Sequence, residues 1–84
     1  MRLRQEMLTW RELEDEAVLL DLGHGVYFTV SSSGIRLLQL LAGGTSQQEL
    51  VDSLMEEFDV DHEQATRDVT SFLDELRGHG LLEP

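Results

Sequence analysis

The stretch AVLLDLGHGVYFTV, residues 17–30, restricts the fold more than any other part of the chain. Two runs of apolar, β-branched and aromatic residues flank the turn-forming triplet Gly23-His24-Gly25. This pattern is typical of a β-hairpin, in which glycine supplies the left-handed backbone conformation that the turn needs. We therefore predict two antiparallel strands, 17–22 and 26–30, with Gly25 in the left-handed position.

The alternation of side chains also predicts the register of this hairpin. A three-residue loop places the apolar side chains of both strands on one face, whereas a two-residue loop would set apolar against polar side chains. The apolar pairs are then Leu22 with Val26, Leu20 with Phe28 and Val18 with Val30. The opposite face carries Asp21, Tyr27 and Thr29.

The rest of the pattern predicts one more strand and three helices. Residues 7–13 alternate like a strand, and apolar residues recur at helical spacing in 35–41, in 50–58 and from Asp61 to the glycines at 78 and 80. Three caps are expected, in Ser31–Gly34, in a capping box from Thr45 to Gln48, and at Asp61. We expect Leu81 and Leu82 to fold back on the core.

The fold class that these elements predict is α+β, with an N-terminal three-stranded antiparallel sheet followed by three helices, as in a winged helix-turn-helix. With 84 residues, the chain is expected to form one domain over residues 1–84. It has no cysteine and no apolar run long enough to span a bilayer, so we expect a cytoplasmic protein that does not bind membranes.

The charge distribution argues against nucleic acid as a partner. The chain has six arginines, no lysine and a formal net charge of −11. The candidate recognition helix carries only Arg67 and Arg77 as cations. Its acidic residues are Asp61, Glu63, Asp68, Asp74 and Glu75. A phosphate backbone requires clustered cations, so a winged-helix transcriptional regulator is the weaker alternative.

Residues with catalytic or metal-binding chemistry form no recognisable constellation. His24, His62 and His79 lie in a turn, at a helix start and at a helix end, without ligand spacing. The acidic runs lack the calcium-loop pattern, and no serine sits in a nucleophile elbow. We therefore expect no catalytic residue, no metal, no cofactor and no enzymatic activity.

The strand 26–30 carries no charge, which is unusual in a chain with 17 acidic residues. At the edge of a sheet such a strand recruits other strands through its unpaired N–H and C=O groups. Strand addition by an extended peptide is one reading. A central strand, or an edge covered by a second copy of the chain, remains equally compatible with these residues.

A resemblance favours the first reading. The segments AVLLDLGHGVYFTVSSSG, LLQLLAGGTSQQELVDSLMEEF and RDVTSFLDELRGHGLLE resemble the PqqD-like family of leader-peptide-binding domains, the RiPP recognition elements. The counterparts of the family pattern are Tyr27 to Ser31, Gly44-Thr45, Asp68-Val69 with Phe72-Leu73 and Leu76, and Gly80 to Leu82. Where the family has Leu-Asn after the third strand, this chain has Val30-Ser31.

The resemblance implies that the leader segment of a ribosomally made precursor peptide adds to the third strand, in a cleft beside the last helix. The implied contacts on the strand are Val26, Tyr27, Phe28, Thr29 and Val30. Those on the helix are Asp68, Val69, Phe72, Leu73 and Leu76. Asp68 and Asp74 either hold a leader cation at the rim of the cleft or are simply exposed to solvent, and the residues favour the second reading. The helix stripe must also close the core, and the sequence does not divide its residues between core and cleft.

The resemblance also implies the partners. Free-standing members of this size are similar to those of lasso-peptide biosynthesis, which present the precursor to a leader peptidase and assist a cyclase. Other members serve radical SAM maturation enzymes, and this pathway is the alternative.

Overall fold

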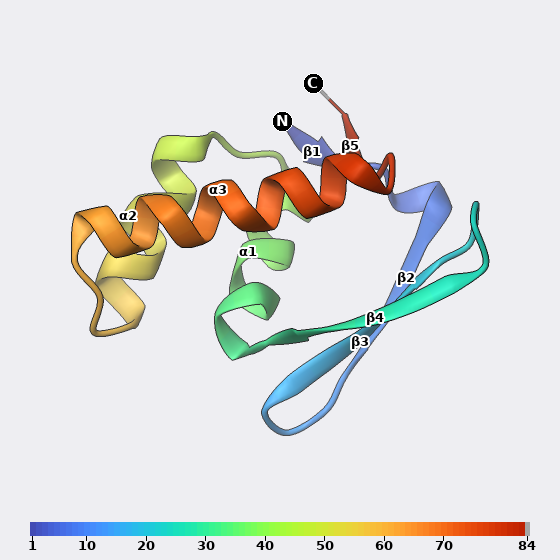
Figure 1. Ribbon diagram of the computed structural model, residues 1–84, viewed down its shortest axis with the longest axis horizontal. Coiled ribbons are helices and arrows are strands. Elements are labelled where there is room, and N and C mark those ends of the chain that lie inside the picture. Colours follow the sequence, from blue (N-terminus) through green and yellow to red (C-terminus); the bar gives the residue numbers. More distant parts are fainter. Residues whose placement is uncertain (84) are drawn as a thin grey trace.

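The computed structural model describes residues 1–83 and confirms the predicted α+β class, a three-stranded antiparallel sheet followed by three helices (Figure 1). The strands are β1 (Arg2–Leu3), β2 (Leu8–Glu12), β3 (Glu16–Asp21), β4 (Val26–Ser31) and β5 (Leu82–Glu83). The helices are the 3-10 turn η1 (Gln5–Met7), α1 (Ser32–Gly43), α2 (Gln47–Glu57) and α3 (His62–Gly78). None of the described helices is long and apolar enough to cross a membrane.

The main sheet has the order β2-β3-β4, so β3 is central and β4 is an edge strand. A second, two-stranded sheet was not predicted, because its strands are only two residues long. In it, β1 pairs with β5 through Arg2 with Glu83 and Leu3 with Leu82. This pairing folds the C-terminal segment back, and Leu81 is fully buried, as the apolar tail suggested.

The predicted register of the hairpin is wrong by one residue. Asp21 pairs with Val26 and Leu19 with Phe28, so the loop has four residues, 22–25. Gly25 has the expected left-handed conformation, with φ of 67°. The loop is longer because Asp21 stays within β3 and binds the turn: its Oδ1 accepts hydrogen bonds from the N–H groups of Gly23 and His24.

This shift changes which side chains of β3 reach the core. Ala17, Leu19 and Asp21 are buried, while Leu20 and Leu22 are exposed. The inner face of β4 carries Phe28 and Val30, as predicted, but opposite Leu19 and Ala17. Asp21 was expected on the outer face with Tyr27 and Thr29. It lies on the inner face instead, where hydrogen bonds compensate its burial.

Two of the helix starts agree with prediction. Asp61 caps α3, with its carboxylate accepting a hydrogen bond from the Gln64 N–H, and Ser31 occupies the N-cap position of α1. The cap of α2 is Ser46 rather than Thr45, and the Ser46 hydroxyl accepts from the Glu49 N–H. The capping box is therefore one residue later than predicted, with Glu49 instead of Gln48.

The core lies between the inner face of the sheet and the helices, and α1 is positioned between α3 and the sheet (Figure 1). Its buried apolar residues are Leu3, Leu8, Ala17, Leu19, Leu37, Leu38, Leu41, Leu50, Val51, Leu54, Ala65, Val69, Leu73, Leu76 and Leu81. Leucines dominate this core, while Phe28 and Phe72 pack only at its margin. That margin borders the free edge of β4.

Candidate peptide-binding site

Within residues 1–83, β4 pairs with β3 along one side only. Hydrogen-bonded pairs alternate in an antiparallel ladder, and the bond from the Leu13 N–H to the Glu16 carbonyl oxygen fixes the phase of this alternation. Residues of β3 that do not face β2 in this pattern, such as Leu19, face β4. The N–H and C=O groups of Phe28, which lies opposite Leu19, therefore point toward β3. The N–H and C=O groups of Tyr27 and Thr29 then point to the free edge, where they can bind an added strand.

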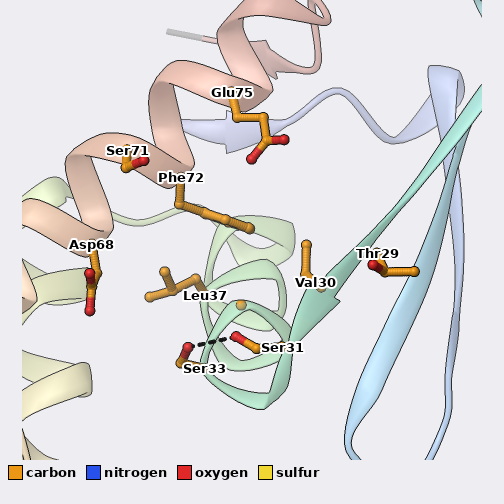
Figure 2. Close-up of a pocket in the computed structure, with 10 residues that line it drawn as sticks. Thr29, Val30, Ser31, Ser33, Leu37, Asp68, Ser71, Phe72 and Glu75 are labelled. Carbon is orange, nitrogen blue, oxygen red and sulfur yellow. Dashed lines mark hydrogen bonds between the residues drawn. The ribbon is translucent and has the colours of Figure 1, made fainter.

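A cleft of about 250 Å³ lies between β4 and α3, and the N-terminal turn of α1 forms its floor (Figure 2). It is lined by Thr29, Val30, Ser31, Ser33, Gly34, Leu37, Asp68, Ser71, Phe72 and Glu75. Figure 2 shows the Phe72 ring extending from α3 toward Val30, while the Thr29 side chain points away from α3. An apolar centre with a polar rim therefore lies directly beside the free edge of β4.

Gly34 allows α1 to approach this closely. A Cβ atom at this position would lie 2.8 Å from the Val30 Cβ and 3.4 Å from the Phe72 ring, both on walls of the cleft. The first distance is shorter than van der Waals contact, so only glycine fits without a displacement. Gly34 therefore determines the depth of the cleft floor.

The residues of α3 that were predicted to contact the peptide fall on two faces of the helix, one in the core and one lining the cleft. Val69, Leu73 and Leu76 are at most 1% exposed and belong to the core. Asp68 and Phe72 line the cleft, together with Glu75, which the sequence analysis missed. Residues four and seven positions apart share one face of a helix, so the spacing from Asp68 would have identified Glu75.

Of the predicted strand residues, Thr29 and Val30 line the cleft. Phe28 is half-buried on the same face as Val30, one pleat further from α1. Tyr27 lies on the outer face of the sheet and is 74% exposed, and Val26 is exposed beside the turn. The floor of the cleft was not predicted as part of the site, because its residues form the end of β4 and the first turns of α1. These residues are Ser31, Ser33, Gly34 and Leu37.

Carboxylates are the charged groups that line the cleft. The Asp68 carboxylate accepts a hydrogen bond from the Gln64 side-chain amide. Asp74 does not line the cleft: it is exposed, as the favoured reading had it, and pairs with Arg77 at 3.4 Å. The rim of the cleft is therefore negatively charged at Asp68 and Glu75.

A polar cluster lies beyond the cleft, where β3 meets its turn. The Asp21 carboxylate is 1% exposed, and its Oδ2 accepts hydrogen bonds from Nδ1 of His24 at 2.7 Å and of His79 at 3.3 Å. Burial opposes ionisation of Asp21, but the hydrogen bonds and charge attraction of His24, with the bond from His79, lower the pKa of this carboxyl below its usual range. His24 and His79 thus bind the same carboxylate, although their spacing in the sequence did not indicate this.

No group of three or more potential ligand side chains within residues 1–83 could hold a metal ion.

Comparison with known proteins identifies the family. A family model described as "Coenzyme PQQ synthesis protein D (PqqD)" matches residues 16–82. The chain belongs to the PqqD family. No curated protein matches it.

Two solved structures of leader-peptide complexes are similar to this PqqD-family chain over almost its whole length. One, described as "TbiB1 in Complex with the TbiA(beta) Leader Peptide", is 35% identical with a TM-score of 0.85 and covers 99% of this chain and 95% of its own. The other, "Lasso peptide synthetase B1 complexed with the leader peptide", is 26% identical with a TM-score of 0.80, and the coverage is 99% and 96%.

Proposed function

We propose that this chain binds the leader segment of a ribosomally synthesised precursor peptide in lasso-peptide biosynthesis. The leader adds as a strand to β4 and inserts side chains into the cleft beside α3. The observation that carries this proposal is the uncharged free edge of β4 adjoining a cleft with an apolar centre. The two leader-peptide complexes of similar fold support it.

Backbone and side chains contribute differently to this binding. The N–H and C=O groups of Tyr27 and Thr29 form ladder hydrogen bonds, which add affinity without reading the peptide sequence. Alternate side chains of the leader enter the cleft, where apolar groups contact Val30 and Phe72. Selectivity therefore arises in the cleft.

The rim of the cleft adds an electrostatic preference. Asp68 and Glu75 face the bound peptide from α3 and favour a leader with a cationic side chain between them. Both carboxylates are exposed to solvent, so salt screens this attraction.

The chain acts by binding and presentation rather than by catalysis. A leader held along β4 leaves the rest of the precursor accessible to a leader peptidase and, after it, a cyclase of the same pathway. A second candidate is a peptide chaperone for a radical SAM maturation enzyme, and the description of the matching family favours it. The enzymes encoded beside this chain distinguish the two.

A charge placed on the apolar wall of the cleft tests the proposal. Phe72→Asp should weaken binding of the leader peptide of the neighbouring precursor by about 100-fold, because an unpaired carboxylate would be desolvated where an apolar anchor inserts. Isothermal titration calorimetry measures this affinity.

Phe58→Asp is the matched control. Phe58 is also half-buried against the core, but it caps α2 and does not line the cleft. Its replacement should leave leader affinity within about twofold of the wild type. Equal affinity of a folded Phe72→Asp variant and the wild type would refute the proposed cleft.

A further inference from the structure

The face of α3 that lines the cleft continues beyond it. Asp68, Phe72 and Glu75 follow one another at helical spacing, and the next position on this face is His79. His79 is the C-cap of α3 and still has helical backbone angles, with φ of −91° and ψ of −1°. On β4, the inward side chain that follows Val30 is Phe28.

These two continuations meet. The His79 imidazole stacks on the Phe28 ring, with 4.7 Å between the ring centroids and 19° between the ring planes. His79 has 30% of its side chain exposed, so the stacked pair lies at the surface. It joins the C-terminal end of α3 to β4, just outside the residues that line the cleft.

The orientation of His79 is determined by Asp21. The Asp21 carboxylate accepts the Nδ1–H of His79, and it is itself held by the backbone of the β3–β4 turn and by His24. Asp21 lies opposite Val26, two residues before Phe28. The imidazole of His79 therefore contacts the β3–β4 hairpin twice, through the Asp21 carboxylate and through the Phe28 ring.

We propose that His79, oriented by the buried carboxylate of Asp21, is a positioning residue of the peptide-binding cleft. It fixes the ring of Phe28 and the distance between the C-terminal end of α3 and β4. The inference rests on the proposed function, since it concerns the same strand and cleft.

Its effect on binding follows from the position of Phe28. The outward-pointing backbone groups of Tyr27 and Thr29 flank this residue, so a strand added to β4 passes beside its ring. Ordering a side chain during association reduces affinity, and a ring already held by a stacked partner avoids that loss. Release of the end of α3 would also widen the cleft beside Glu75.

The test compares two histidines that bind the same carboxylate. His79→Asn keeps an amide that can donate to Asp21 but removes the ring from Phe28, and it should weaken leader binding about three- to tenfold. His24→Asn also exchanges an imidazole on Asp21, yet His24 is the partner that does not stack on Phe28. It should change the affinity by less than about twofold.

A measurement on the wild-type protein alone makes the test independent of variant folding. In ¹H–¹³C NMR spectra of the wild type, the ring protons of His79 should be shifted upfield by the ring current of Phe28. Absence of the shift in the wild type would overturn the inference. Equal leader affinities of His79→Asn and the wild type, or equal losses in both histidine variants, would also overturn it. A wild-type protein that binds no leader would instead refute the proposed function.

Discussion

The two edges of the main sheet differ in their protection. β2 has the sequence LTWRE and carries Arg11 and Glu12, whereas β4 has the sequence VYFTVS and carries no charge. Charged side chains on an edge strand hinder pairing with foreign strands. The chain therefore protects one edge and leaves the other open, and the open edge is the one beside a cleft.

The inner neighbours of the two edges differ as well. Trp10 of β2 is half-buried against the core, and the Glu12 carboxylate accepts a hydrogen bond from Gln39 of α1. Val30 of β4 instead borders the space in front of α3 (Figure 2). An open edge becomes a binding site only where the adjacent side chains also leave room.

Proline substitution should reveal the difference between the edges most strongly. Thr29→Pro removes an N–H that points to the free edge of β4 and leaves the pairing with β3 intact, so leader affinity should fall by about tenfold or more. Fluorescence anisotropy with a labelled leader measures the change.

Glu12→Pro removes an outward N–H from β2 and serves as the control. It should leave the affinity within about twofold of the wild type. If both variants lost affinity equally at unchanged stability, the two edges would not differ in function.

The next largest effect is expected on stability, from a methyl group added at Gly34, where α1 packs against β4. Gly34→Ala places a Cβ 2.8 Å from that of Val30, so it should lower the free energy of unfolding by about 1–3 kcal/mol. Gly43→Ala, in the last turn of the same helix, has no atom within 4 Å of the added Cβ and should be neutral or slightly stabilising. Urea unfolding compares the two variants, and equal stabilities would contradict the tight approach of α1 to β4.

The smallest expected effect concerns acid. Replacing an aspartate in the β3–β4 turn and one in the β2–β3 turn should change stability with a different dependence on pH. The pKa of Asp21 is lowered in the folded state, so its stabilising contribution is present above the unfolded pKa of about 3.9 and is lost as pH falls through the folded value. The stability difference between wild type and Asp21→Asn should therefore shrink from about pH 5 to about pH 3.

Asp15→Asn, in the exposed β2–β3 turn, provides the comparison. Its difference from wild type should stay small at both pH values, as chemical denaturation monitored by circular dichroism can determine. A pH-independent effect of Asp21→Asn would contradict the lowered pKa.

Local patterns were sufficient to predict most of the fold. The hairpin, the Asp61 cap and the three helices depend on residues close together in the sequence. The absence of charge in 26–30 was compatible with an open edge and with a central strand, and the family resemblance favoured the edge. The register was predicted wrongly because alternation treats Asp21 as a surface residue. Its burial depends partly on His79, which follows 58 residues later.

The cleft was predicted only in outline for a related reason. Val69 and Leu73 lie next to Phe72 on α3, and hydrophobicity alone assigns all three to one stripe. Their division between core and cleft depends on where α1 and β4 pack, and Gly34 controls that packing. The stacking of His79 on Phe28 likewise joins segments that share no local pattern.

The uncovered side of β4 presents its unpaired backbone groups to a second copy of the chain as well as to a peptide. An antiparallel pair of identical strands is self-complementary about a twofold axis, so two unliganded molecules can satisfy each other's backbone groups. A dimer of this kind would compete with the leader for the same N–H donors, and the apparent dissociation constant would then rise with protein concentration. Dilute solution is the regime in which the intrinsic affinity is observed.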